Sequence, residues 1–233
     1  MNTRKKWFLT LGIGAVAGVV VLLRFGHTQN PDWPDDLVTS IAMQSDGRTI
    51  LAGKFSTDKI ERREVNGLTD TLFSAKRNVG GFNAAVLAIK VQEDDRIIAV
   101  GKFTNFDDAV TGFIARLNSD GSLDSDFAKA TGTGLDDEAT SILIDRQGKI
   151  LIGGKFSSYN GHSAKYLVRL NPDGTWDSTF DSSNLLDGPV YSISSDSGGY
   201  AALAGNFVSY TAERVDFFVR ITESGEPLIH SPL

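Results

Sequence analysis

The sequence predicts an all-β domain of four repeats with a β-propeller-like fold, preceded by one N-terminal transmembrane helix. The first observation is a short phrase that occurs four times, as LAGKF, AVGKF, IGGKF and LAGNF. Its glycines are Gly53, Gly101, Gly154 and Gly205, so the period is 48, 53 and 51 residues. The second observation is that strand-like and turn-like sequence flanks each copy, and periods of this size with strand content are typical of propeller blades. The third is an uncharged apolar run near the N-terminus.

Each repeat begins with two predicted strands joined by a tight turn. In the first repeat LVTSIAMQ (37–44) is followed by SDGR and then by TILAGKF, and the same order recurs three times. Asp-Gly between two such runs is a hairpin signal, because glycine takes a positive φ without steric cost. A third strand and a second turn follow, most clearly in 113–127 and 166–180. We therefore expect about four short strands per unit, with units at 35–83, 84–137, 138–188 and 189–233.

Stacking of the units explains the repeated phrase. One four-stranded unit does not bury both of its faces, so successive units are expected to stack face to face as blades. The phenylalanine that ends each phrase is expected to pack between blades, and the glycines to let neighbouring backbones approach. These phenylalanines are Phe55, Phe103, Phe156 and Phe207.

Two long segments of the third unit carry a family resemblance. KILIGGKFSSYNG, a gap, and YLVRLNPDGTWDSTF resemble the delta-60 repeat family of bacterial β-propeller proteins. The second unit is similar, and the first and fourth match in part, so the resemblance covers about residues 35–233. It implies a propeller fold and no activity. Family members often carry more than four repeats, which leaves three alternatives: four blades close alone, another copy completes the arc, or another protein does.

The apolar run from Trp7 to Leu23 predicts a membrane anchor. It contains no charge over 17 residues, and as a helix it would be roughly 25 Å long, near the thickness of a bilayer core. Three basic residues precede it and one arginine follows it. The positive-inside tendency then leaves the N-terminus in the cytoplasm and the propeller on the periplasmic or extracellular side of the inner membrane. Residues 1–27 form the tail and anchor and 28–36 a short stalk; a cleaved signal peptide and a buried core helix are the alternatives.

Composition narrows the partners and the chemistry. Residues 1–27 hold four basic residues and no acid, so the remainder holds 19 basic and 29 acidic residues. An acidic body argues against a nucleic-acid partner, because phosphate binding needs a basic face. The chain has no cysteine, which excludes disulfides, thiolate metal ligands and cysteine nucleophiles.

Polar residues recur in the second half of the repeats. An arginine recurs in the third strand and an aspartate follows seven or eight residues later, a spacing that predicts Arg–Asp pairs across a hairpin. The arginines are Arg63, Arg116, Arg169 and Arg220, and the aspartates are Asp70, Asp124 and Asp177. The N-x-D-G-x-x-D arrays at 118–124 and 171–177 lack the bidentate glutamate of a calcium loop, so we interpret them as hairpin turns. We expect no metal and no cofactor.

The sequence lacks the phosphate-loop, hydrolase and zinc-protease motifs. IGGKF around Lys155 has neither the second glycine nor the Ser or Thr of a phosphate loop,. The three histidines, His27, His162 and His230, lie far apart, and no hydrolase or zinc-protease motif occurs,. We therefore expect no enzyme. The one candidate carboxylate pair for a glycosidase or lyase is Asp108 with Asp136 or Asp137.

The long loops predict the binding face, because binding residues concentrate on loops that a rigid scaffold holds. The candidate residues on these loops are Phe106, Asp107, Asp108, Asp136, Asp137, Glu138, Tyr159, Asn160, His162 and Tyr210. Together with the anchor they predict a protein-interaction scaffold or accessory subunit of a membrane complex. The alternative is an adhesive or ligand-binding propeller that recognises glycan or peptide through Tyr159, Tyr210 and nearby acids.

Overall fold

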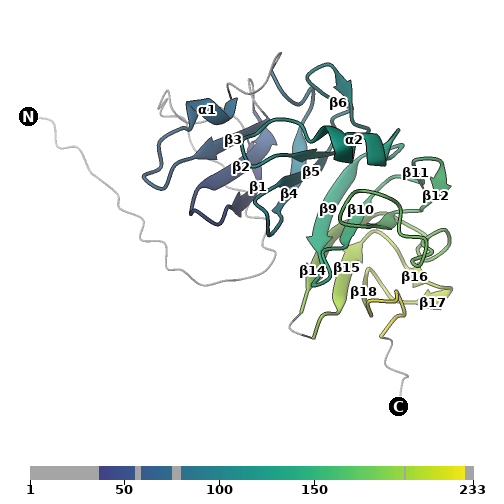
Figure 1. Cartoon of the computed structure of the whole chain (residues 1–233). Coiled ribbons are helices and arrows are strands. Elements are labelled where there is room, and N and C mark those ends of the chain that lie inside the picture. Colours follow the sequence, from purple (N-terminus) through teal and green to yellow (C-terminus); the bar gives the residue numbers. More distant parts are fainter. Residues whose placement is uncertain (1–36, 56–58, 75–79, 197, 229–233) are drawn as a thin grey trace, which may run out of the picture.

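Four small antiparallel sheets follow one another along an arc in the computed structural model, which describes residues 37–55, 59–74, 80–196 and 198–228 (Figure 1). The predicted anchor with Trp7 and Leu23, the stalk 28–36, His27 and His230 lie outside the described residues. Within the part of the chain that the structure describes, no helix is long and apolar enough to cross a membrane.

Each unit contributes one three-stranded sheet, whose second strand is central. In the first unit these strands are β1 (Leu37–Met43), β2 (Thr49–Lys54) and β3 (Ile60–Arg63), and in the second β4 (Val86–Val91), β5 (Ile97–Gly101) and β8 (Ile114–Leu117). In the third unit they are β9 (Ala139–Ile144), β10 (Ile150–Gly154) and β13 (Leu167–Leu170), and in the fourth β14 (Val190–Ser195), β15 (Ala201–Gly205) and β18 (Phe218–Ile221). The all-β propeller-like prediction is confirmed at this level.

A two-stranded hairpin connects the second and third strands of the last three units. The hairpins are β6–β7 (Asn105–Phe106, Ala109–Val110), β11–β12 (Ser158–Tyr159, His162–Ser163) and β16–β17 (Ser209–Tyr210, Glu213–Arg214). Two short helices, α1 (Thr71–Ser74) and α2 (Ser125–Thr131), follow the third strands of the first two units.

The predicted fourth strand is reduced to a single bridge in each described unit. The bridges are Arg63↔Thr69, Leu117↔Leu123, Leu170↔Trp176 and Ile221↔Pro227. The cause in the second unit is Asp124, whose carboxylate accepts hydrogen bonds from the backbone amides of Asp126 and Phe127. An aspartate at this position caps a helix, so the chain turns into α2 instead of extending along the sheet.

The repeated glycine is required by a close approach within its own unit. A Cβ on Gly154 would lie 2.4 Å from the carbonyl oxygen of Glu138, at the start of β9, where the register between β9 and β10 shifts. The backbone at the start of the first strand thus lies so close to the glycine that a residue with a Cβ would clash with a carbonyl oxygen. The same approach occurs at the other three glycines, with distances of 2.1 to 2.3 Å.

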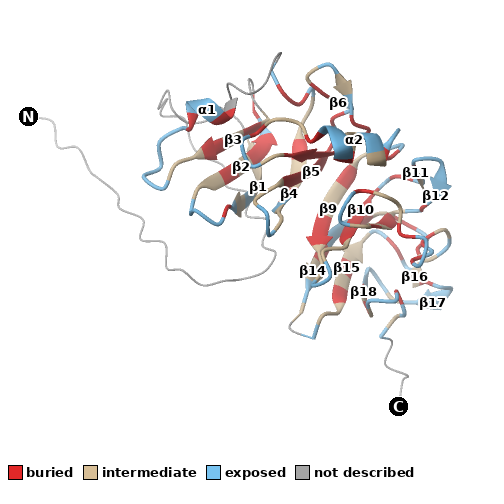
Figure 2. Cartoon of the chain, in the orientation of Figure 1, coloured by how far each residue is buried: buried red, intermediate tan, exposed pale blue. Residues whose placement is uncertain are grey.

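Three apolar clusters form the core, and each joins two consecutive units. Phe103 clusters with Ile50 of the unit before it, and Phe156 with Ile98 in the same way. Phe207 lies in a cluster with Leu143 of the third unit. Figure 2 shows the buried residues concentrated on the strands and on the segments between neighbouring sheets. These three phenylalanines therefore confirm the predicted packing between blades.

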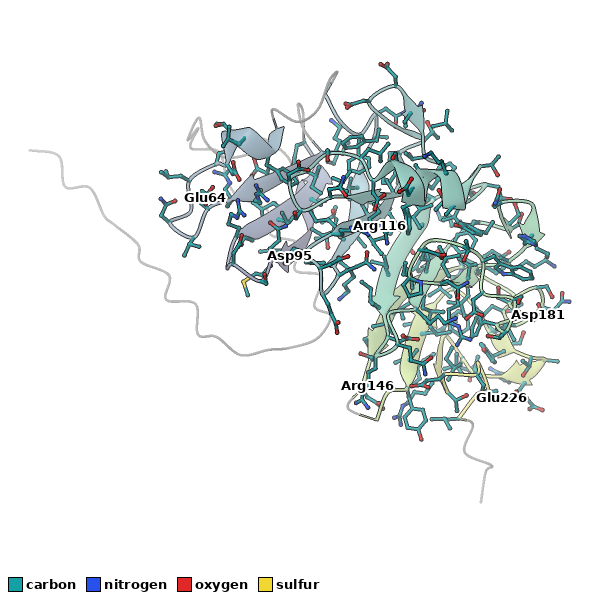
Figure 3. The ribbon with its side chains drawn as sticks, in the orientation of Figure 1. Glu64, Asp95, Arg116, Arg146, Asp181 and Glu226 are labelled. Atoms are coloured by element: carbon teal, nitrogen blue, oxygen red, sulfur yellow. The ribbon has the colours of Figure 1, made fainter. Side chains whose placement is uncertain are left out.

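An arginine links each sheet to the next one. Arg116 on β8 donates from Nε to Asp124 at 2.9 Å, and its guanidinium carbon lies 4.4 Å from the ring centre of Phe127. From Nη1 it donates to the carbonyl oxygen of Pro172 in the following unit, at 2.6 Å. Arg116 is labelled in Figure 3, among the side chains at the centre of the arc. One side chain thereby fixes a turn in its own unit and a turn in its neighbour.

The same arrangement recurs in the units on either side. Its members are Arg62, Asp70 and Phe73 in the first unit, with the Ser119 carbonyl as acceptor, and Arg169, Asp177 and Phe180 in the third, with the Glu223 carbonyl. In the first unit the prediction that Arg63 pairs with Asp70 is wrong, because Arg62 does so. Arg63 pairs with Glu61 instead, because adjacent residues of a strand point to opposite faces of the sheet,.

The fourth unit departs from the pattern. Leu228 stands eight residues after Arg220, where the other units have an aspartate. Arg220 therefore pairs with Asp196, in the turn between β14 and β15, and lies over the ring of Tyr200.

The Asp177 carboxylate is held in its charged form. Burial acts to raise the pKa of Asp177, but hydrogen bonds from Thr179, Lys149 and Arg169 outweigh burial and hold it well below its ordinary value. The pair of Asp177 and Arg169 is largely withdrawn from solvent. A depressed pKa in the folded state means that the charged group stabilises the fold.

We predict that Asp177→Asn lowers the free energy of unfolding at pH 7 by on the order of 3 kcal/mol, because it leaves buried cations without their partner. The folded-state pKa lies below the unfolded value of about 3.9, so this contribution is present above that pH and is lost as the pH falls toward the folded pKa. Urea unfolding from pH 7 to pH 3 should show the difference from wild type shrinking below about pH 4.

The control is Asp126→Asn, which removes an exposed carboxylate that pairs only with Lys129 on the surface of α2. This variant should follow the wild type within a few tenths of a kcal/mol. A difference between Asp177→Asn and wild type that stays constant down to pH 3 would contradict the assignment.

Candidate interaction face

Three hairpins along one side of the arc form the candidate face: β6–β7, β11–β12 and β16–β17 (Figure 1). Each has two residues between its strands, and in β11–β12 these are Asn160 and Gly161 with φ of 45° and 80°. Two left-handed residues are the geometry of the tight hairpin turn that matches strand twist. The tip of β11–β12 is therefore set by local backbone chemistry.

The base of each hairpin is tied down by a side chain that precedes the first strand of the unit. Asp136 accepts hydrogen bonds from the backbone amides of Ser157 and Ser158, at 2.8 and 3.0 Å, and from the Ser157 hydroxyl at 2.6 Å. Asn83 plays the same part for the amides of Thr104 and Asn105 in the second unit. In the fourth unit Asp187 accepts from Val208 and Ser209.

These bonds also set the charge state of Asp136. Burial acts to raise its pKa, but the hydrogen bonds from Ser157 and Ser158 outweigh burial and lower it. Asp136 is thus an ionised positioning group whose two oxygens are already engaged, which does not suit the general acid of a glycosidase.

The three aromatic residues of the predicted face are in the core. Phe106, Tyr159 and Tyr210 are at most 1% exposed. The Tyr159 hydroxyl donates to the carbonyl of Gly174, and the Tyr210 hydroxyl donates to that of Gly225 at 2.6 Å. Burial raises the pKa of both hydroxyls. The prediction that these rings face a ligand is corrected: each ring sits on the inward side of its hairpin.

Asp107 and Asn160 dock the hairpin tips on the segment before the unit. Both take left-handed φ, of 49° and 45°. The Asp107 carboxylate accepts from the backbone amide of Gly81 at 2.8 Å, and the Asn160 side-chain oxygen accepts from the backbone amide of Thr133 at 3.4 Å. The backbone amide of Asn160 also donates to the Gly134 carbonyl, at 2.7 Å. Their side chains therefore help to shape the face and are only in part offered to a partner.

Glu138 joins two units at the start of β9. Its carboxylate lies 3.1 Å from Nζ of Lys102 and 2.5 Å from Nζ of Lys155. Burial acts to raise its pKa, but the two lysines outweigh burial and lower it. Asp108, Asp137 and His162 are exposed and remain available on the face.

Other exposed residues of the face were missed by sequence reasoning. Val110 is 67% exposed and the Arg214 side chain is 83% exposed. Trp176 stacks on His162, with ring centres 4.1 Å apart. No sequence signal marks Val110 and Arg214, because each lies in a strand of two residues, in which alternation cannot be read. The strand register places both on the side of the hairpin opposite the buried ring,.

The predicted turn reading of the N-x-D-G-x-x-D arrays agrees with the geometry. The Asp120 carboxylate accepts from the amide and hydroxyl of Ser122, which closes the turn on itself. In residues 37–55, 59–74, 80–196 and 198–228 no three acidic or histidine side chains are grouped so as to hold a metal ion.

Comparison with known proteins supports the fold. A model of a β-propeller family described as a domain of unknown function (DUF5122) matches residues 92–127 and 148–180. These segments lie in the second and third units, so the match supports a β-propeller fold there. No curated protein matches the chain.

Three solved structures of low sequence identity match the chain in part. A streptogramin B lyase has 15% identity and a TM-score of 0.48, with 82% of this chain and 53% of that chain covered. A protein of unknown function from Bacteroides caccae has 11% identity and a TM-score of 0.46, covering 82% and 65%. Virginiamycin B lyase from Staphylococcus aureus has 13% identity and a TM-score of 0.44, covering 85% and 55%. The chain thus spans about half to two thirds of the length of these structures, and the likeness carries no argument about function.

We predict that Asp136→Ala loosens the β11–β12 hairpin without unfolding the sheet. The amides of Ser157 and Ser158 lose their acceptor, and one hydrogen bond is worth about 1 to 1.5 kcal/mol. Their hydrogen exchange should therefore become about tenfold faster, whereas exchange in β10 should not change.

The matched control is Asp137→Ala, because Asp137 is exposed and bonds only to the amide of Glu138. Equal exchange rates at Ser157 and Ser158 in both variants would show that Asp136 does not hold the hairpin.

Proposed function

We propose that this chain is a membrane-anchored, extracytoplasmic β-propeller that acts as a protein-interaction scaffold or accessory subunit of a membrane complex. One feature supports this role: three hairpins with the same tied base present different exposed tips. Asn83, Asp136 and Asp187 hold the bases by equivalent hydrogen bonds. A rigid scaffold with variable loops is the usual form of a recognition surface.

The chemistry of the tips fits a protein surface as partner. The exposed side chains are Asp108 and Val110 on the first hairpin, His162 on the second, and Glu213 and Arg214 on the third. They mix an apolar residue, an imidazole and both signs of charge. Protein interfaces have this mixed character, with arginine enriched among the residues that contribute most to affinity.

The membrane part of the proposal rests on the sequence. The uncharged run from Trp7 to Leu23, flanked by basic residues, is expected to sit in the lipid bilayer with the N-terminus inside,. The propeller would then stand on the periplasmic or extracellular side, close to the subunits of a membrane complex.

A glycan- or peptide-binding propeller receives less support from the geometry. That alternative depended on Tyr159 and Tyr210, and both rings are buried with their hydroxyls bonded to backbone carbonyls. Without these rings, the three described hairpins present no pair of aromatic residues that could stack on a sugar. His162 on β12 does contact an aromatic ring, but this ring is Trp176 outside the hairpins, and the two already stack on each other.

We predict that tagged full-length chain, purified in mild detergent from its native membrane, carries stoichiometric partners that mass spectrometry identifies. A triple tip variant, Val110→Asp, His162→Ala and Arg214→Ala, should lose at least tenfold of the bound partner because it changes all three tips. Its melting temperature should match wild type, since all three side chains are exposed,.

The control variant carries Lys90→Ala, Glu93→Ala and Asp126→Ala, three exposed residues outside the hairpins. It should retain the partner. The proposed function would be overturned if the full-length protein and a form lacking residues 1–27 were both recovered without partners. It would also be overturned if the two triple variants retained the partner equally.

A further inference from the structure

The four described units form an open arc and do not close into a ring. Strand β1 packs on β4, β4 on β9 and β9 on β14, but β14 and β1 lie at opposite ends of the series (Figure 1). Glu64 of the first unit and Glu226 of the last mark these ends in Figure 3. The arc therefore has a leading face on the first unit and a trailing face on the fourth.

The contact between neighbouring units is repeated three times inside the chain, so its parts are known. The unit that comes first supplies an arginine, which donates to a carbonyl in the second turn of the next unit: Ser119, Pro172 or Glu223. It also supplies a buried phenylalanine. A Cβ on the glycine of that turn would lie 2.8 Å from the phenylalanine, at Gly121, Gly174 and Gly225 alike.

The first strands meet at the same contact. Ser40 Oγ accepts from the amide of Ile89 at 3.1 Å, and Ser141 Oγ accepts from the amide of Ile193 at 2.8 Å. In both cases the serine belongs to one unit and the isoleucine to the next. The neighbouring threonines, Thr39 and Thr140, donate to carbonyls of the next unit at 2.6 and 2.7 Å.

The leading face presents the receiving half of this contact with nothing described against it. Ile41 occupies the position of Ile89, Ile142 and Ile193 in the repeat. Those three are 2%, 2% and 6% exposed, whereas Ile41 is 64% exposed. Gly67 occupies the position of the turn glycines, and a Cβ there would meet no atom within 4 Å. Val65 and Leu68 beside it are exposed.

The trailing face presents part of the supplying half. Phe218 occupies the position of Ile60, Ile114 and Leu167 at the start of the third strand. Those residues are at most 1% exposed, whereas Phe218 is 51% exposed. The Arg220 side chain is 41% exposed, against 5%, 7% and 12% for Arg62, Arg116 and Arg169. Tyr191 is exposed next to Ser192, which takes the position of Ser40 and Ser141.

We propose that the trailing face of one chain binds the leading face of a second copy of this chain. The two faces carry matching parts of a contact that the chain already makes three times: Ser192, Phe218 and Arg220 on the trailing face, and Ile41 with the turn at Gly67 on the leading face. Repeat arrays normally end in polar capping surfaces, but here both ends carry large exposed apolar side chains, Ile41 and Phe218. Apolar surface of this kind marks a site of association.

Two copies are the expected number. A head-to-tail contact builds a ring if its rotation closes, and propellers typically hold four to eight blades. Two arcs of four units give eight. Across the new contact, Ser192 of one copy would lie beside Ile41 of the other, and Arg220 would point at the Val65 carbonyl.

A cysteine experiment tests the contact, because the chain has no native cysteine. Full-length Ser192→Cys and Ile41→Cys variants are prepared separately in detergent, mixed, allowed to exchange subunits, and treated with a short bismaleimide. The mixture should give a covalent dimer of twice the 25.1 kDa chain mass. Each variant alone should give at least tenfold less dimer, because a head-to-tail contact does not bring two identical positions together.

A mixture of Val208→Cys with Ile41→Cys is the matched control, since Val208 is exposed on a hairpin away from the predicted contact. Dimer of equal yield in this control would show random collision and overturn the proposal. Cross-linking within one chain of a Ser192→Cys, Ile41→Cys double variant, without dimer from the mixture, would show closure of a single chain and overturn it as well.

Native mass measurement gives a second, independent readout. Wild type should be a dimer, Phe218→Asp and Ile41→Asp should each be monomeric with unchanged circular dichroism, and Val208→Asp should remain a dimer. A wild-type protein that contains one copy of the chain would overturn the proposal. This holds both for a chain without any partner and for one whose end faces bind a different protein. This result does not depend on the proposed scaffold function, which is tested by partner recovery and the hairpin variants.

Discussion

The rest of the structure depends on a guanidinium group placed between two sheets. Arg116 reaches a carboxylate and an aromatic ring in its own unit and a backbone carbonyl in the next, so it joins elements that are far apart in sequence. Only arginine offers several donors in a planar group that also stacks on a ring. Asp124 would be costly to bury alone, but it also caps α2, and its charge is matched,. Each sheet is too small to bury its own faces, and this link sets how it lies on its neighbour.

A contact that repeats makes the environment of a residue depend on whether its unit has a neighbour. Ile41 and Ile89 have the same place in the repeat, and Phe218 and Ile114 do as well, but only the members inside the arc are buried. In such an array stability is a sum of unit and nearest-neighbour terms. The terminal units therefore lack one stabilising contact each. A second copy would supply a contact of the kind that already joins the inner units, and its free energy would add to the stability of the terminal units.

Much of the architecture could be predicted from the sequence, because period, hairpin signals and the GKF phenylalanines are local features. The failures are places where a single residue of register or a tertiary contact decides. Arg62 and Arg63 are adjacent and chemically identical, so only the strand pairing shows which one faces Asp70. The fourth strand is replaced where Asp124 caps a helix. Tyr159 and Tyr210 lie in strands of two residues, too short for alternation to be read, so their burial follows from packing that the sequence does not display.

Partner recognition and self-association would use separate surfaces of this molecule. On the sheets, exposure at a given repeat position changes from inner to outer units, as it does from Ile89 to Ile41. On the hairpins it does not: Val110, Ser163 and Arg214, the second residues of β7, β12 and β17, are exposed in the second, third and fourth units alike. The exposed side chains of the hairpins are therefore outside the contact between units. A ring of two arcs would bury the end faces, keep every hairpin accessible, and present each tip twice, which raises the avidity for a partner with two matching sites.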